Sequence, residues 1–153
     1  MRNAFSNASV ATTQKNSKVL LLTGDHGYTL FDAFRKACPA QYLDCGGVEQ
    51  SMVGVAAGLA KTGFRPIVYS LAALVSICVL EQIKIDACYG GLPVTFIGAG
   101  VVYDPSKHRG HRSIAGHATN SIHSPCDRSE LTVCIEYIMC HSVLSRTSRI
   151  YLN

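Results

Sequence analysis

The stretch Asp44–Ala60, DCGGVEQSMVGVAAGLA, contains a strand end, a glycine turn and most of a helix. Gln41–Asp44 is predicted as a short strand, and Gly46 and Gly47 as the tight turn that follows it. The helix is predicted over Glu49–Lys61, because its apolar residues recur at helical spacing. These residues are Val53, Ala56, Ala57 and Ala60.

Strand and helix signals alternate on both sides of this stretch. Short apolar runs closed by turn residues predict strands at Lys18–Thr23, Gln41–Asp44, Pro66–Tyr69, Pro93–Ile97, Ser121–Ser124 and Arg149–Leu152. Helices are predicted at Thr29–Ala37, Glu49–Lys61, Leu71–Cys88 and Asp127–His141. The expected fold is therefore α/β, with a parallel sheet of about six strands and helices on both faces. In such folds ligands bind at the carboxyl ends of the strands.

Composition indicates one globular domain in a chain of 153 residues, 48% of them hydrophobic and 16% charged. We expect residues 18–153 to form that domain and residues 1–17, rich in Ser, Asn and Thr, to be a flexible lead-in. An organellar transit peptide is the alternative for that segment. No apolar run has the length of a membrane span. The mild net charge of +4 does not indicate nucleic acid. An odd set of seven cysteines favours free thiols and a cytoplasmic location.

Five further segments, together with Asp44–Ala60, carry a resemblance to a known family. They are Gly24-Asp25-His26-Gly27-Tyr28, Phe64–Ser70, Glu81-Gln82-Ile83-Lys84-Ile85-Asp86, Leu92-Pro93-Val94 and Ser124-Pro125-Cys126-Asp127 with Glu130. In this order they resemble the pyrimidine-binding domain of transketolase-type enzymes, which depend on thiamine diphosphate. The match extends over roughly residues 18–152.

The resemblance assigns the central chemistry to Glu49. In the family, the carboxyl group at this position bonds a ring nitrogen of the cofactor's aminopyrimidine and helps that ring to exchange protons. Asp25 is expected to touch the cofactor. Taken alone, Glu49 is equally an acidic residue in the first turn of a helix, where the helix dipole stabilises it. Asp25 alone is equally a turn-forming residue.

The chain departs from the family in the pocket around the aminopyrimidine. Leu71, Leu74 and Ile77 occupy positions where transketolases carry aromatic residues, and we expect them to line the cofactor pocket. Aliphatic side chains give up ring stacking worth roughly 0.5–1.5 kcal/mol. Packing in the protein core is the alternative for these three residues.

A second departure is the shortened loop around residues 103–117. His111 is the best match to the family's substrate-facing histidine, and Arg109 and Arg112 cluster near it, where they could hold a phosphorylated sugar. His26 is a further substrate candidate. A solvated basic loop is the alternative. The spacing of the histidines and Cys126 fits no common zinc pattern, so we expect no metal site in this chain.

The family's diphosphate site has a Gly-Asp-Gly signature followed by an asparagine, and this sequence carries none. The resemblance therefore implies a partner subunit that holds the diphosphate and Mg²⁺, in a homodimer or heterotetramer. The expected reaction is transfer of a two-carbon ketol unit between sugars or sugar phosphates. A decarboxylating thiamine enzyme, of the deoxyxylulose-phosphate synthase or keto-acid type, and a non-catalytic regulatory partner are the alternatives.

Overall fold

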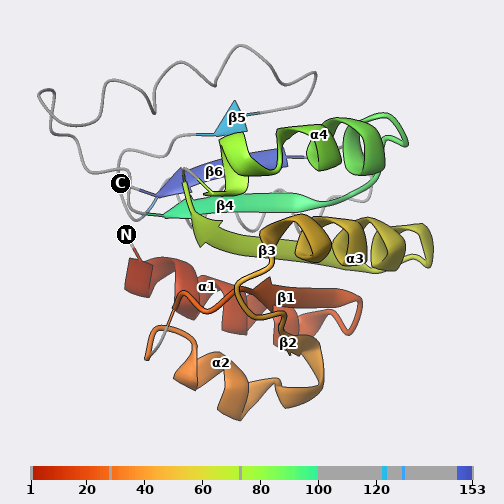
Figure 1. Cartoon of the computed structure of the whole chain (residues 1–153). Coiled ribbons are helices and arrows are strands. Elements are labelled where there is room, and N and C mark those ends of the chain that lie inside the picture. Colours follow the sequence, from red (N-terminus) through yellow and green to blue (C-terminus); the bar gives the residue numbers. More distant parts are fainter. Residues whose placement is uncertain are drawn as a thin grey trace, which may run out of the picture.

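A computed structural model describes residues 2–27, 29–72, 74–99, 122–123, 129 and 148–152 (Figure 1). Six strands form one sheet, in the order β2-β1-β3-β4-β6-β5, and each described pair is parallel. The strands are β1 Val19–Thr23, β2 Tyr42–Asp44, β3 Arg65–Leu71, β4 Thr95–Ala99, β5 Ile122–His123 and β6 Ser148–Leu152. The predicted α/β fold with a parallel sheet is confirmed.

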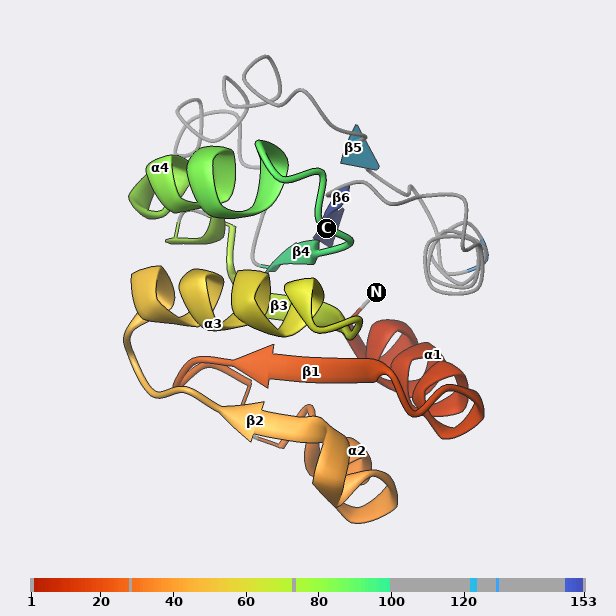
Figure 2. The ribbon, with the colours of Figure 1, turned by 90° about the vertical axis from the view of Figure 1, so that its right-hand side faces the viewer.

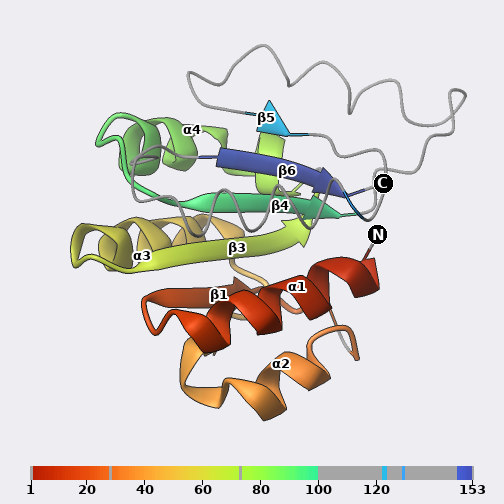
Figure 3. The same cartoon turned by 180° about the vertical axis from the view of Figure 1, so that it is seen from behind.

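Helices cover both faces of this sheet (Figures 2 and 3). Helices α1, Arg2–Lys15, and α2, Asp32–Ala37, lie on one face; a single turn, η1 Pro39–Gln41, leads from α2 into β2. The other face carries α3, Glu49–Lys61, and a succession of short helical segments: η2 Leu74–Cys78, α4 Leu80–Gln82 and η3 Ile83–Cys88. None of the helices within the described residues is long and apolar enough to cross a membrane.

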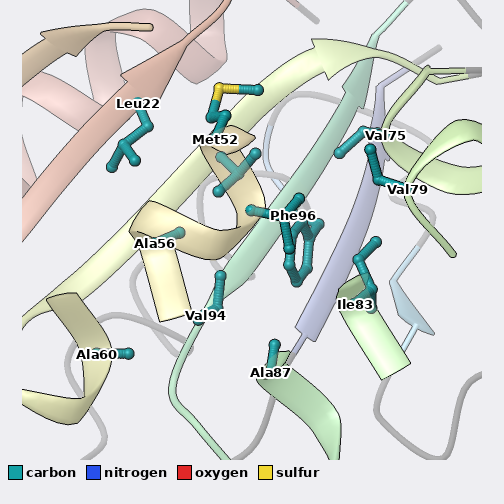
Figure 4. Packing of buried hydrophobic residues seen from close by; sticks show 12 residues of the cluster. Leu22, Met52, Ala56, Ala60, Val75, Val79, Ile83, Ala87, Val94 and Phe96 are labelled. Atoms are coloured by element: carbon teal, nitrogen blue, oxygen red, sulfur yellow. The ribbon is translucent and has the colours of Figure 1, made fainter. Parts of the chain in front are cut away.

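The side chains of each strand alternate between two hydrophobic clusters, one on each face of the sheet, because successive side chains of a strand point to opposite faces. Leu21, Ile67 and Ile97 pack with the α1 and α2 side chains. Leu22, Val68 and Phe96 face α3, η2 and η3 (Figure 4). From the helices, the second cluster takes Met52, Val53, Ala56, Ala60, Val75, Val79, Ile83 and Ala87. Three of the four apolar positions predicted for the α3 face, Val53, Ala56 and Ala60, lie in this cluster.

The expectation of a flexible lead-in over residues 1–17 is wrong. Residues 2–15 form α1, and its Phe5 is fully buried in the core. The Phe5 ring stacks on Tyr69, with 5.7 Å between centroids, and meets Phe31 edge-on. Small hydroxyl residues fill much of the remaining buried face: Ser6, Ser9, Thr12 and Thr13. The helix lacks a long apolar stripe for this reason, and the sequence pattern does not reveal it.

The long helix predicted over Leu71–Cys88 is also different in the structure. Leu71 still belongs to β3, where it pairs with Ala99 of β4. The helical segments begin at Leu74, and two of them, η2 and η3, have the wider π-helical turn. This part of the chain is rich in β-branched residues, which are less favourable in a regular α-helix than unbranched ones. The helix predicted over Asp127–His141 lies outside the described residues, apart from Ser129.

The cysteines of the described residues differ in their access to solvent. Cys38 is buried and Cys45 is half-buried, whereas Cys78 is exposed. Burial raises the pKa of the Cys38 thiol. Burial, and then the negative charge of Asp44, raise the pKa of the Cys45 thiol. At neutral pH these two thiols are therefore held further from the reactive thiolate form.

Replacement of Phe5 with alanine tests whether α1 is part of the core. We expect Phe5→Ala to lower the free energy of unfolding by roughly 3–5 kcal/mol, because it removes a buried ring that contacts two other rings. Tyr89→Ala, at a side chain that is 93% exposed, is the control and should change stability by less than about 0.5 kcal/mol. Denaturant unfolding measures both. Equal, small effects would mean that α1 is not packed as described.

Alkylation tests the contrast among the thiols. We expect iodoacetamide at pH 8 to modify Cys38 and Cys45 about tenfold more slowly than Cys78, or slower still, because only exposed thiolates react. Since the pKa of each of the two thiols is raised, their rates should increase as the pH rises above about 9. Peptide mass spectrometry follows each site, and the differences should vanish in urea. Fast modification of Cys45 in the folded chain would contradict the burial described.

Candidate functional site

Three chain segments meet at the carboxyl edge of the sheet. Strands β1 and β3 are parallel neighbours with Thr23 opposite Tyr69, so their ends lie side by side. Gly24, Asp25 and His26 follow β1, Ser70 lies near the end of β3, and α3 begins at Glu49. Parallel strands place their carboxyl ends at one edge, and this is the edge where α/β folds bind ligands.

Glycines allow the backbone to close in around Glu49. Gly46 has a φ of 70°, in the left-handed region that a side chain disfavours. At Gly24, an added Cβ would lie 3.1 Å from the carbonyl oxygen of Gly46 and 3.4 Å from Oε1 of Glu49. The turn between β2 and α3 is held by the Cys45 N–H, which donates to the Thr23 carbonyl at 2.8 Å. The two loops thus pack directly against each other.

Glu49 is the first residue of α3, and its side chain is only 14% exposed. Its Oε1 accepts a hydrogen bond from the Ser70 hydroxyl at 3.1 Å. The start of a helix favours a negative charge, so the backbone of α3 also stabilises this carboxylate. Ser70 is fully buried, and the sequence motifs do not single it out. Sequence reasoning could have found Ser70 from its position at the carboxyl end of a predicted strand, within the segment Phe64–Ser70 that resembles the family.

His26 and Asp25 lie beside Glu49. The Nδ1 atom of His26 is 2.9 Å from Oδ1 of Asp25 and 3.8 Å from Oε1 of Glu49. Neither approach has the alignment of a hydrogen bond, and this buried nitrogen has no hydrogen-bond partner among the described residues. Asp25 is 60% exposed and therefore faces the space beyond the strand ends. Three sequence-predicted site residues are thus brought together.

Asp25, His26 and Glu49 also place one ligand atom each within 4.8 Å of one another, a spacing that can hold a metal ion. Two carboxylates and an imidazole suit several divalent metals. Exposed acidic groups such as Asp25 are common where no metal binds. Oε1 of Glu49 also already accepts the hydrogen bond from Ser70. The expectation of no metal site in this chain stays a prediction.

The apolar residues predicted for the cofactor pocket lie mostly outside the core. Leu71 is exposed and follows Ser70 directly, Ile77 is exposed, and Leu74 is half-buried. Ile77 also borders a shallow groove between the start of α3 and the η2–η3 segments. There the Gln50 side chain donates to the Cys78 carbonyl oxygen at 3.3 Å. Lining of the cofactor pocket by Leu71, Leu74 and Ile77 remains a prediction.

The remaining substrate candidates, Arg109, His111 and Arg112, lie outside the described residues. The site consists of Glu49, which accepts a hydrogen bond from Ser70, with His26 and Asp25 close to it. Chemically, it offers one carboxylate that is shielded from water on one side and open on the other. Such a group can hold and exchange a proton with a bound ring nitrogen.

Comparisons with known proteins identify the family of the chain. The sequence profile described as "Transketolase, pyrimidine binding domain" matches residues 1–137. The chain is 29% identical, over 90% of its length, to a subunit of the apulose-4-phosphate transketolase of Phocaeicola vulgatus, of which it covers 47%. It is 26% identical to a 6-deoxy-6-sulfo-D-fructose transketolase subunit of a Clostridium species, over 92% of this chain and 46% of that protein. The chain therefore spans about half the length of these relatives.

Other relatives are longer enzymes. The 1-deoxy-D-xylulose-5-phosphate synthase of a Synechococcus species is 32% identical over 90% of this chain, which covers 22% of that protein. Among solved structures, one described as "Split gene transketolase, inactive beta4 tetramer" superimposes with a TM-score of 0.85 at 24% identity. The superposition covers 99% of this chain and 50% of that one, and it shows a shared fold.

The matched profile includes α1 as well as the motif at Glu49, so both belong to one domain type. The fold, the motif order and the family match agree: the chain belongs to the transketolase pyrimidine-binding domain family, whose members are thiamine-diphosphate-dependent.

Proposed function

We propose that this chain is the pyrimidine-binding subunit of a split, transketolase-like enzyme, and that Glu49 activates thiamine diphosphate within it. The observation that carries the proposal is the placement of Glu49. Its carboxyl group accepts a hydrogen bond from Ser70 at the carboxyl edge of the sheet, at the first turn of α3 and close against Gly24.

The described residues fit the aminopyrimidine end of the cofactor. A flat ring needs close approach to the backbone, and the Gly46–Gly47 turn offers it: an added Cβ would meet nothing within 4 Å at Gly46, and at Gly47 its nearest neighbour would be Oδ2 of Asp25 at 3.7 Å. A ring nitrogen needs one carboxyl group, which Glu49 supplies. We propose that Leu71, Leu74 and Ile77, which are exposed or half-buried, line the pocket in place of the aromatic residues of other transketolases.

When bound, the cofactor supplies a carbon that attacks the sugar carbonyl once a proton has left it. This chain's part is to hold and move a proton at the Glu49 carboxyl group. We propose that Asp25 contacts the cofactor and that His26 contacts the substrate; both residues lie close to Glu49. Arg109, His111 and Arg112 would bind the phosphate or hydroxyl groups of the sugar.

The reaction that we propose is transfer of a two-carbon ketol unit between sugars or sugar phosphates. Two relatives that match about 90% of the chain are named as transketolase subunits acting on sugar derivatives, which supports ketol transfer. The decarboxylating alternative is supported by the match to 1-deoxy-D-xylulose-5-phosphate synthases at 32% identity. A non-catalytic partner is the third possibility, and the retained Glu49 opposes it.

A second subunit would complete the site. We propose that it holds the diphosphate and Mg²⁺, and that the assembly is a homodimer or heterotetramer of cytoplasmic location. Two relatives named as transketolase subunits, together with the solved split-gene transketolase, support a divided enzyme.

The divided site predicts that the chain alone binds thiamine diphosphate poorly. In calorimetry with Mg²⁺, micromolar solutions of the purified chain should give no saturable heat. The same titration after mixing with the diphosphate-binding subunit should saturate, because the diphosphate then has its own ligands. Magnesium-dependent, micromolar binding by the isolated chain would contradict the proposal.

Replacement of Glu49 tests the catalytic assignment. Glu49→Gln keeps the size of the side chain but removes the acid. We expect cofactor binding by the assembled complex to survive and proton loss from the reactive cofactor carbon to slow roughly 10²–10⁴-fold, the range for a lost acid–base group. Hydrogen–deuterium exchange followed by NMR measures this step.

The matched control for that experiment is Glu81→Gln, at an exposed glutamate of α4. It should leave the exchange rate unchanged. If the Glu49→Gln complex exchanges as fast as the wild type, Glu49 is only a helix-start residue, and the non-catalytic alternative becomes the better one.

A further inference from the structure

Ser70 is a polar residue in an otherwise apolar row of β3. Its side chain is fully buried and lies on the same face of the sheet as Val68, toward α3. The backbone around it is engaged in the ladder, with Ser70 opposite Gly98 of β4. A buried hydroxyl group that makes no hydrogen bond costs free energy. The Ser70 hydroxyl is therefore expected to have a hydrogen-bond partner.

The partner is the Glu49 carboxyl group. The Ser70 hydroxyl donates to Oε1 at 3.1 Å, at the long end of the range for such bonds. This bond links the end of β3 to the first turn of α3. Both atoms sit on elements fixed by the core, since Val68 and Met52, their near neighbours in the chain, are fully buried.

The two oxygens of Glu49 are not equivalent. The contacts described above involve Oε1. It lies 3.1 Å from the Ser70 hydroxyl and 3.8 Å from Nδ1 of His26, and a Cβ added at Gly24 would lie 3.4 Å from it. Oε1 is therefore the inner oxygen, enclosed by three segments. Oε2 takes part in none of these contacts.

We propose that Ser70 is a positioning residue for Glu49 and fixes which oxygen exchanges the proton. The inference rests on the proposed role of Glu49 in activating the cofactor. Because Oε1 already accepts the Ser70 hydrogen, the proton of the neutral acid resides on Oε2. It leaves from Oε2 to the ring nitrogen and returns there, while the Ser70–Oε1 bond persists through both states.

Three variants separate this role from simple packing. Ser70→Ala removes the donor, and Ser70→Cys keeps the size of the side chain with a weaker donor. Ser6→Ala is the matched control, because Ser6 is also buried and its hydroxyl also makes one hydrogen bond, to the Leu30 carbonyl at 2.7 Å. Ser6 lies on α1, on the opposite face of the sheet from Glu49.

The first measurement uses the full chain without cofactor. Labelling with ¹³C-glutamate gives few signals, and the Glu49 signal is the one that Glu49→Gln removes. We expect side-chain coupling constants typical of one rotamer in the wild type and in Ser6→Ala, and averaged couplings in Ser70→Ala. A single rotamer in Ser70→Ala would overturn the positioning role directly, whatever the enzyme's activity.

The second measurement is cofactor carbon exchange in the assembled complex with thiamine diphosphate and Mg²⁺. Ser70→Ala should slow exchange by about tenfold, the lower end of what a hydrogen bond to a charged group is worth, with cofactor affinity unchanged. Ser70→Cys should recover part of the rate, and Ser6→Ala should match the wild type.

The outcomes distinguish the two proposals. If Glu49→Gln slows exchange and Ser70→Ala does not, Glu49 is catalytic and Ser70 is only a core residue. If Glu49→Gln itself exchanges at the wild-type rate, the proposed function fails, while the rotamer measurement still decides whether Ser70 holds Glu49. If Ser70→Ala does not fold, Ser70→Cys carries the test, and a wild-type rate with averaged couplings in that variant would overturn the inference.

Discussion

The site depends on the hydrogen bond between Ser70 and Glu49, because this bond joins the sheet to the helix α3. Ser70 is placed by the central strand β3, which pairs with both β1 and β4, and Glu49 is placed by the first turn of α3. The register of β1 against β3 brings Gly24 to the same point, where only a glycine leaves room for the carboxyl group without displacement of its neighbours. A shift of any of these elements by one residue would separate the donor from the acceptor, because a strand presents opposite faces at successive residues.

The same strand carries both faces of the core, and its alternation explains why the site and α1 are coupled. Tyr69 points to the α1 face, where it packs between Phe5 and Phe31, with ring centroids 5.7 and 4.8 Å away. Ser70, the next residue, points to the α3 face and holds Glu49. The packing of α1 therefore supports the strand segment from which the positioning hydroxyl projects. Aromatic contacts of this kind contribute roughly 0.5–1.5 kcal/mol beyond the area that they bury, which is a useful share of a small domain's stability.

The parts of the fold that the sequence predicts are those with a strong local pattern. The predicted bounds of α3 are those of the structure, because a glycine turn precedes it and apolar residues recur at helical spacing. Helix α1 escapes prediction, since Ser and Thr fill its buried face, and burial of hydroxyl groups leaves no hydrophobic period to detect. Within the site, motif positions predict Glu49, Asp25 and His26. They do not predict the role of Ser70, because a hydrogen bond across 21 residues depends on the pairing of strands.

Electrostatics at the strand edge bear on which end of thiamine diphosphate this chain would hold under the proposed function. Asp25 and Glu49 approach the same histidine nitrogen, at 2.9 and 3.8 Å, so their carboxyl groups share a small region. A diphosphate brought into this region would meet two acidic groups, of which Glu49 is largely buried and Asp25 is exposed, and repulsion is strongest near the buried one. A thiazolium ring carries a positive charge, and the neutral aminopyrimidine offers nitrogens for hydrogen bonds. Both match these carboxyl groups. Under the proposed function, the described edge of the sheet therefore suits the ring end of thiamine diphosphate better than the phosphate end, and the phosphates would need a cationic or metal-binding surface placed away from Asp25 and Glu49.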